Sequence, residues 1–394
     1  MQPCLICGPG PARIACEDPH EKTGLMFYKN AERTSNMKFE LCNLSVEQGQ
    51  KVQGFLELPF TTDRIPCTLI YGEEDGETAL VEGGLHNAEY VGIETAIGLA
   101  GMLEPSDIRG KLIIIHLLNV NGFRQRTVSV CAEDGKNLNR VFPGNPDGTY
   151  ADKMAYFMEK EIYPKIDYFI DVHNGDWFED LVPFIYAVGK APEETVKKAE
   201  EMAKAADVPF FVRSSGTSGA YNHAGVMGIP SVLLERGCMG NWTREEVEAS
   251  QKDVRNILRR VGILISDRFH GDLQRNIPRL MPHSHYVDSD KEGCWFPMRK
   301  AGDMVEAGEL VGVIKDFFGN TIDEIRFDED CMILYQTVSY SLPKNTPLVA
   351  YGHYEDCIET TGDHHRHAHT HPNSMVKVHV AEEFQYESDG ETEK

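Results

Sequence analysis

The sequence predicts a wound α/β domain followed by a small all-β module. Between residues 37 and 270, short apolar runs typical of buried strands alternate with helix-like segments. Between about 275 and 352, strand-like runs are separated by Gly and Pro turns, and no helical period is present. We therefore expect the α/β domain over 37–270 and the β module over 275–352.

The expected elements of the α/β domain follow one another in a regular order. A strand over 78–85 leads into a helix over about 88–103, and the run KLIIIHLL at 111–118 is short enough for a buried strand. Further central strands are expected at 168–173, 184–188 and 231–235. The segment 192–206 has a helical apolar face formed by Val196, Ala199, Met202, Ala203 and Ala206.

The two ends of the chain differ from this pattern. Residues 1–36 are rich in Gly, Pro and charge and are expected to be an extension. Cys4, Cys7, Cys16 and His20 could form a small zinc knuckle, but a single C-x-x-C favours an unstructured segment. The segment 353–394 is expected to be a tail that is first His-rich and then acidic. Its clustered histidines have the composition of a divalent-metal binder: His364, His365, His367, His369 and His371.

Charge and composition exclude several classes of protein. The formal net charge of the 394 residues is −23, which argues against a nucleic-acid or anionic-membrane partner. We see no apolar window of the roughly 18 residues that a membrane span requires, and no export signal precedes the domain. The ten cysteines are scattered without a disulfide framework, so we expect a cytoplasmic protein with reduced thiols.

Three residues have the types and positions of metal ligands. His86 and Glu89 are three residues apart where a strand gives way to a helix, and can face one ion. His173 ends an apolar strand, where polar residues line the crevice of an open α/β sheet. Asp171 points the same way as His173 and could orient it. Two histidines and a glutamate can hold Zn²⁺ and leave a position open for water.

Other polar residues are candidates for catalysis and binding. Glu235 ends the strand PSVLLE and is either a salt-bridge partner or a general base. Asn139 and Arg140 can bind a substrate carboxylate, with the arginine in a bidentate fork. Arg126 could polarise the scissile carbonyl and stabilise the oxyanion, and Arg124 competes for that role.

At these residues the chain resembles the succinylglutamate desuccinylase/aspartoacylase family, a branch of the zinc carboxypeptidase superfamily. The segments that carry the resemblance are GGLHNAEYVGIE, NVNGFRQR, DGKNLNRVFPG, DVHNGD and SVLLERG. The resemblance implies a doubly wound mixed sheet of the zinc-carboxypeptidase type. The segment GCWFPMRKAGDMVEAGELVGVI resembles the family's C-terminal module, which is similar to a barrel-sandwich.

The resemblance also assigns roles by position. It places the metal ligands at His86, Glu89 and His173, the carboxylate-binding pair at Asn139 and Arg140, and the general base at Glu235. Many family members have a further arginine shortly before the Asn-Arg pair. Val128 and Val130 occupy that neighbourhood here, which leaves the role to Arg126 or Arg124.

The sequence thus predicts a deacylase with one Zn²⁺ per subunit that hydrolyses the amide bond of an N-acyl amino acid or a related small amide bearing a carboxylate. Zn²⁺ would activate water and Glu235 would accept its proton. Two alternatives remain: a metallocarboxypeptidase, and a non-catalytic zinc-binding or storage protein that relies on the His-rich tail. The expected partner is a small molecule, and a homo-oligomer is left open.

Overall fold

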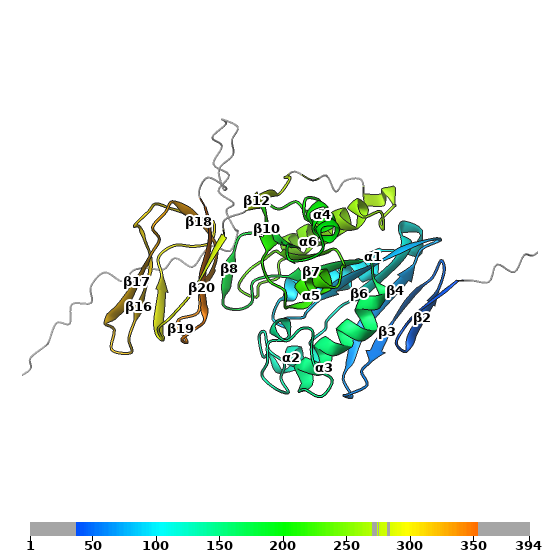
Figure 1. Ribbon diagram of the computed structural model, residues 1–394, viewed down its shortest axis with the longest axis horizontal. Coiled ribbons are helices and arrows are strands. Elements are labelled where there is room, and N and C mark those ends of the chain that lie inside the picture. The colour runs from blue at the N-terminus through cyan, green and yellow to red at the C-terminus, as the bar shows by residue number, and fades with distance from the viewer. Residues whose placement is uncertain (1–36, 270–273, 275, 282–283, 354–394) are drawn as a thin grey trace, which may run out of the picture. The chain divides into compact units, whose positions relative to one another are not determined.

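The structure, a computed structural model, describes residues 37–269, 274, 276–281 and 284–353, and within them nine strands form one mixed sheet (Figure 1). In sheet order these strands are β12 (Arg279–Met281), β10 (Phe210–Ser214), β9 (Phe184–Val188), β11 (Ser231–Glu235), β7 (Tyr168–His173), β5 (Glu74–Gly83), β6 (Arg109–Ile115), β4 (Arg64–Tyr71) and β3 (Lys51–Glu57). The neighbours β11, β7, β5 and β6 run parallel, so their C-terminal ends share one edge of the sheet.

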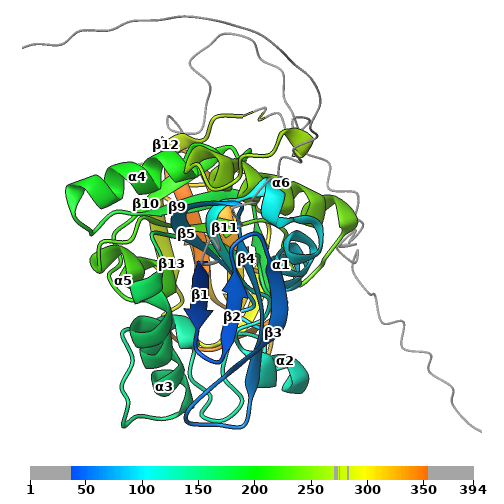
Figure 2. The same cartoon turned by 90° about the vertical axis from the view of Figure 1, so that its right-hand side faces the viewer.

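Helices cover both faces of this large sheet (Figure 2). One face packs against α1 (Tyr90–Met102), α4 (Glu193–Ala203) and α6 (Arg244–Arg260), and the other against α3 (Tyr150–Phe157) and α5 (Ala220–Val226). Successive residues of β5 alternate between the two cores: Leu80 belongs to one, and Ala79 and Val81 belong to the other. Burial on both faces explains why the central strands read as continuous apolar runs.

Shorter elements complete this part of the chain. They are the hairpin β1 (Lys38–Leu41) and β2 (Leu44–Glu47), the helix α2 (Val120–Gln125), the π-helical segment η3 (Met158–Ile162), and the 3₁₀ turns η1 (Pro105–Asp107), η2 (Leu138–Arg140), η4 (Tyr163–Lys165) and η5 (Asp267–Phe269). Among the described helices, none combines the length and apolar character that crossing a lipid bilayer requires.

The strands after residue 283 form two antiparallel sheets, and we call residues 284–353 the β module. One sheet contains β13 (Ser284–Asp288), β20 (Pro347–His353), β18 (Cys331–Thr337) and β15 (Met304–Val305). The other contains β17 (Thr321–Arg326), β16 (Leu310–Lys315), β14 (Gly293–Pro297) and β19 (Ser341–Leu342). Buried Trp295 is part of the core between them and donates its indole N–H to the carbonyl of Thr337 at 3.0 Å.

A short strand of the α/β part belongs to a sheet of the β module. β8 (Glu179–Leu181) follows β7 in the chain, but it pairs with β18, where Tyr335 lies opposite Leu181. Beside it, Phe184 and Phe210 of the large sheet pack against Met332 and Leu334 of β18. The β module is therefore joined to the α/β part by both backbone pairing and apolar contact.

The predicted fold class is confirmed, and the central strands fall where the sequence places them. The strands predicted at 168–173, 184–188 and 231–235 are β7, β9 and β11, residue for residue. The strand expected over 78–85 starts earlier, at Glu74, and α1 begins at Tyr90. β6 ends at Ile115, before a turn in which Leu118 N–H donates to the carbonyl of Gly83 at 3.1 Å. β12 pairs with β10 in the large sheet.

Helix α1 approaches β7 so closely that a side chain is excluded at the contact. A Cβ atom at Gly92 would lie 2.3 Å from the carbonyl oxygen of Val172, the residue before the last position of β7. A Cβ atom at Gly83 would likewise lie 2.6 Å from the carbonyl oxygen of Gly92. Backbone atoms on both sides leave little room for relaxation.

This contact can be tested by replacing Gly92 with Ala. We expect Gly92→Ala to lower the free energy of unfolding by about 1–3 kcal/mol, because α1 must move away from β7. Gly101→Ala is the matched control in the same helix, since nothing lies within 4 Å of a Cβ atom there. It should stabilise the helix by about 0.5–1 kcal/mol. Urea unfolding of both variants checks the difference, and equal stabilities would contradict the close contact.

Candidate metal centre and active site

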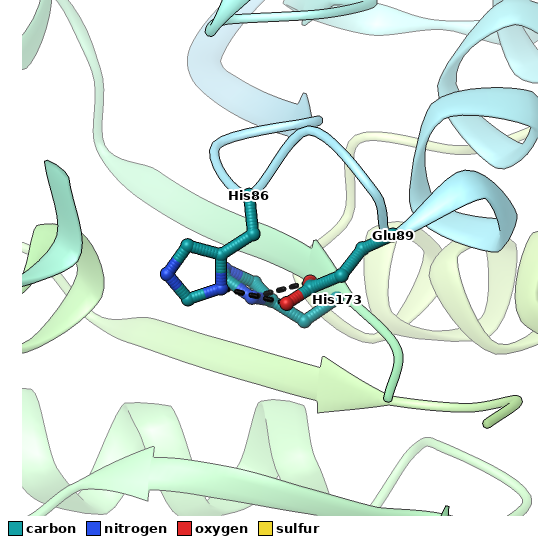
Figure 3. Close-up of side chains that lie close together, drawn as sticks. All are labelled: His86, Glu89 and His173. Atoms are coloured by element: carbon teal, nitrogen blue, oxygen red, sulfur yellow. Dashed lines mark hydrogen bonds and ion pairs between the residues drawn. The ribbon is translucent and has the colours of Figure 1, made fainter. Parts of the chain in front are cut away.

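His86, Glu89 and His173 converge at the C-terminal edge of the large sheet (Figure 3). Oε1 of Glu89 lies 2.6 Å from Nδ1 of His86, and Oε2 lies 2.8 Å from Nδ1 of His173. One ligand atom from each residue lies within 4.8 Å of the other two. Two imidazoles and a carboxylate at this spacing form a donor set that fits Zn²⁺.

The local backbone explains this convergence. β5 ends at Gly83, and Gly84 adopts a φ of 68°, which turns the chain sharply out of the sheet. Glu89 is the residue directly before α1, and His173 is the last residue of β7, the sheet neighbour of β5. The start of the helix and the end of the strand therefore meet at the same edge.

A second layer of oxygen atoms faces the outer side of both histidines. Oδ1 of Asn137 lies 3.0 Å from Nε2 of His86 and can accept its proton. Oδ1 of Asp171 lies 3.0 Å from Nε2 of His173, within ion-pair distance but outside hydrogen-bond geometry. Nε2 of each ring thus faces one of these oxygens, and Nδ1 faces Glu89. Oxygen atoms in this outer position are known to orient histidines that bind metal ions. The sequence predicts this role for Asp171 but not for Asn137, whose signal is its place at the head of the Asn-Leu-Asn-Arg segment.

The charges of the three residues are coupled. Burial disfavours the charged form of Glu89, but His173 and His86 outweigh that effect and lower its pKa to about 2. Burial also opposes the charge of His173, yet Asp171 and Glu89 raise its pKa well above the usual range. The surroundings thus favour positive charge at this point, and a divalent cation would take the place of the proton because metal binding requires a neutral imidazole.

Glu235 lies at the same edge, at the end of β11. It is the register partner of His173 on the neighbouring parallel strand. Its Oε2 is buried and has no hydrogen-bond partner within the described part of the chain. Burial, followed by the charge of Glu89, raises the pKa of Glu235 well above its usual range. A carboxyl group in such surroundings can take up and release a proton.

Asn139 and Arg140 are connected to the candidate metal ligand His86 through Asn137. The backbone N–H of Asn139 donates to Oδ1 of Asn137 at 2.8 Å, the same oxygen that faces His86. Oδ1 of Asn139 accepts from the N–H of Ala220 at 2.8 Å, which leaves the side-chain NH₂ to donate to a ligand. Arg140 is exposed and uses one N–H on the carbonyl of Asn139 at 3.2 Å, so most of its guanidinium can also face a ligand.

The two candidate arginines before this turn differ in their surroundings. The guanidinium of Arg124 lies 3.7 Å from Oδ1 of Asp63. Arg126 ends α2 in the left-handed conformation, with φ 58° and ψ 48°, and its side chain is exposed. Two residues further on, the carbonyl of Val128 accepts a hydrogen bond from the backbone N–H of Ala88 at 2.9 Å. Ala88 lies between His86 and Glu89 in the chain. The segment that follows Arg126 is therefore hydrogen-bonded to the loop that contains His86 and Glu89.

Two acids near the candidate metal ligands, buried Asp176 and half-buried Glu179, have no role predicted from the sequence. Oε2 of Glu179 accepts from the backbone N–H of Asp176 at 3.0 Å. Burial, then the charges of Asp176 and Glu89, raise the pKa of Glu179 to about 7. Burial also raises the pKa of Asp176, with a contribution from Glu89. Asp176 closes the segment DVHNGD, in which the sequence assigns it no role, and Glu179 lies beyond that segment, where its position depends on the pairing of β8 with the β module.

Tyrosines of the β module lie in the same surroundings. The hydroxyl of Tyr286 in β13 lies 2.8 Å from that of Tyr186 in β9. Burial and Glu179 raise the pKa of Tyr335 in β18. The β module therefore places Tyr335 next to Glu179 and Tyr286 next to Tyr186.

Comparison with known proteins places the chain in a family. A sequence model of the succinylglutamate desuccinylase/aspartoacylase catalytic domain matches residues 75–261. The N-alpha-acetyl-L-2,4-diaminobutyric acid deacetylase of Halomonas elongata is 30% identical over 291 residues, which cover 70% of this chain and 82% of that protein.

Solved structures are similar over most of the chain. The product-bound ectoine utilization protein EutE (DoeB) from Ruegeria pomeroyi is 27% identical, with a TM-score of 0.69 over 77% of this chain and 95% of that one. A succinylglutamate desuccinylase from Silicibacter sp. is also 27% identical, with a TM-score of 0.68 over 77% of this chain and 96% of its own. These matches confirm the resemblance inferred from the motifs: the chain belongs to the succinylglutamate desuccinylase/aspartoacylase family.

Proposed function

We propose that the protein is a zinc-dependent deacylase that hydrolyses the amide bond of an N-acyl amino acid. The observation that carries this proposal is the convergence of His86, Glu89 and His173 at the sheet edge where Glu235 also ends its strand. The name of the Halomonas relative and the description of the matching catalytic domain support a hydrolytic deacylase.

In this proposal, His86, Glu89 and His173 hold one Zn²⁺. The bound ion would lower the pKa of a water molecule and polarise the acyl carbonyl. Asn137 and Asp171 keep the two imidazole rings in the orientation that directs Nδ1 to the centre. Because Glu89 faces both rings, it fixes their separation as well as supplying negative charge.

The remaining residues act on protons and on substrate charge. Glu235 accepts a proton from the attacking water at its carboxylate and delivers it to the leaving amine. Arg126 stabilises the developing oxyanion, and the pairing of Arg124 with Asp63 makes Arg124 the weaker candidate. The NH₂ of Asn139 and the guanidinium of Arg140 hold the substrate carboxylate.

The acids Asp176 and Glu179 indicate the kind of amino acid that the site accepts. The buried carboxyl group of Asp176 and the half-buried one of Glu179 repel one another beside Glu89, and removal from water raises the pKa of both. A positively charged amine on the substrate side chain would relieve that repulsion. We therefore propose an N-acyl diamino acid as substrate, and the diaminobutyric acid in the name of the Halomonas relative supports this choice.

We also propose a cytoplasmic location, as the sequence predicts. Five cysteines of the described residues are free thiols, which suits a reducing compartment: Cys42, Cys67, Cys131, Cys238 and Cys294.

The metal assignment can be tested by replacing one ligand. We expect His86→Ala to lose the zinc that survives dialysis against a chelator, because the donor set of the ion falls to two protein groups. His116→Ala is the control, since His116 is a histidine of the same sheet region that contacts Thr68 at 2.8 Å instead. Elemental analysis of both variants measures zinc per chain. Equal zinc contents would mean that the ion is held elsewhere.

The role of Glu235 can be separated from stability. Glu235→Gln keeps the shape of the side chain but cannot accept a proton, so turnover should fall by roughly two to four orders of magnitude. Zinc content should stay normal, and the melting temperature should hold or rise, because burial raises the pKa of Glu235 and disfavours its charged form. Measuring zinc, melting temperature and kcat on one preparation checks this. A kcat near that of the unaltered protein would remove Glu235 from the mechanism.

Substrate choice can be tested with a panel of small amides. N-acetyl-2,4-diaminobutyrate should be turned over faster than N-acetyl-2-aminobutyrate, which lacks the second amine. Glu179→Gln should lower kcat/KM for the diamino substrate by roughly 10- to 100-fold, the effect of losing one hydrogen bond to a charged group. It should leave the neutral substrate unchanged. Faster cleavage of short peptides would favour a carboxypeptidase, and an absence of turnover on every amide would favour a zinc-binding or storage protein.

A further inference from the structure

A second group of histidine and glutamate side chains lies at one end of the β module. His353 is the last residue of β20, and His285 lies on the adjacent strand β13. Glu329 lies in the turn between β17 and β18, two residues before Cys331. Cys331 is the register partner of His353. Sheet pairing therefore brings three potential metal ligands from distant parts of the sequence to one place.

The carboxylate of Glu329 lies between the two imidazoles. Its Oε2 lies 2.5 Å from Nε2 of His353, and its Oε1 lies 3.6 Å from Nε2 of His285. Glu89 has the same relation to its two histidines, with one carboxylate oxygen directed to each ring. A carboxylate and two imidazoles suit a divalent transition-metal ion such as Zn²⁺ or Ni²⁺.

Aromatic rings and acidic side chains surround the three residues. The ring of His285 stacks on Tyr351 at 5.0 Å, and Tyr351 stacks on Phe327 at 4.0 Å. Glu329 also borders a cleft of about 560 Å³ whose lining includes Asp328 and Glu324. Arg326 in the same lining contacts Glu324 at 2.9 Å, so that acid is partly neutralised while Glu329 faces the histidines.

We propose that His285, Glu329 and His353 form a second divalent-cation site on the β module. The site is looser than the first, because within the described residues only His86, Glu89 and His173 have three ligand atoms all within 4.8 Å of one another. His285 is about half exposed, with 51% of its side chain accessible, so it can move toward an ion. Ligands that must close around the ion bind it less tightly than preformed ones, and the second site should therefore exchange its metal more readily.

The sequence that follows His353 contains further potential metal ligands. The chain continues from the site into the segment that contains His364, His365, His367, His369 and His371. These residues lie outside the described part of the chain, and the proposed site does not include them. The experiment must therefore distinguish binding by the β module from binding by these histidines.

The test uses the full chain with the first site disabled by His86→Ala and the five tail histidines replaced by Ala. Titration of this variant with zinc alone, measured by isothermal titration calorimetry, should still show one bound ion per chain. Adding Glu329→Gln should weaken that binding by at least roughly tenfold, the loss of about 1.4 kcal/mol. Glu324→Gln is the matched control, because Glu324 borders the same cleft but contacts Arg326. It should leave the dissociation constant unchanged.

A second variant guards against misfolding. His285→Ala should weaken zinc binding in the same way, and the melting temperature of each variant shows whether the β module is still folded. Zinc binding that vanishes when the tail histidines alone are replaced would overturn the proposal. Equal affinities with Glu329 and with Gln at that position would overturn it as well.

Discussion

The close packing of α1 on β7 is the constraint on which the candidate site depends. Gly92 has no side chain, and its position would place a Cβ atom 2.3 Å from the carbonyl of Val172. The helix can therefore begin next to the end of the strand, which puts Glu89 within 2.8 Å of His173. A wider separation would part the carboxylate from the imidazole of His173, and the other candidate ligand of the same loop, His86, would no longer share that carboxylate.

The candidate site concentrates negative charge in a buried place. The acids whose charges act on one another around His86 and His173 are Glu82, Glu89, Asp171, Asp176, Glu179 and Glu235. Burying so many carboxyl groups is costly unless cations or protons compensate them. The electrostatic potential at this edge of the sheet is therefore negative, which suits both a divalent metal ion and a substrate that carries an amine.

Sequence reasoning succeeded where side chains are set by regular structure. β7 and β11 are predicted residue for residue, because buried parallel strands are mostly apolar and these two end in a polar residue, His173 in one and Glu235 in the other. It missed Asn137 and Glu179, whose positions depend on contacts between distant segments. Asn137 directly precedes the 3₁₀ turn η2. Glu179 lies in β8, which pairs with β18 of the β module and not with the large sheet. Periodicity within a segment carries no information about such contacts.

The position of β8 also bears on how this architecture could be altered. β8 is continuous in the chain with the α/β part, yet its backbone hydrogen bonds go to β18. A truncation that removed residues 284–353 would leave β8 unpaired and expose Phe184 and Phe210. Unpaired strands next to apolar surface promote aggregation, so the shortened protein would be difficult to keep in solution. Protein engineers who wish to exchange the β module for another would have to transplant β8 together with it.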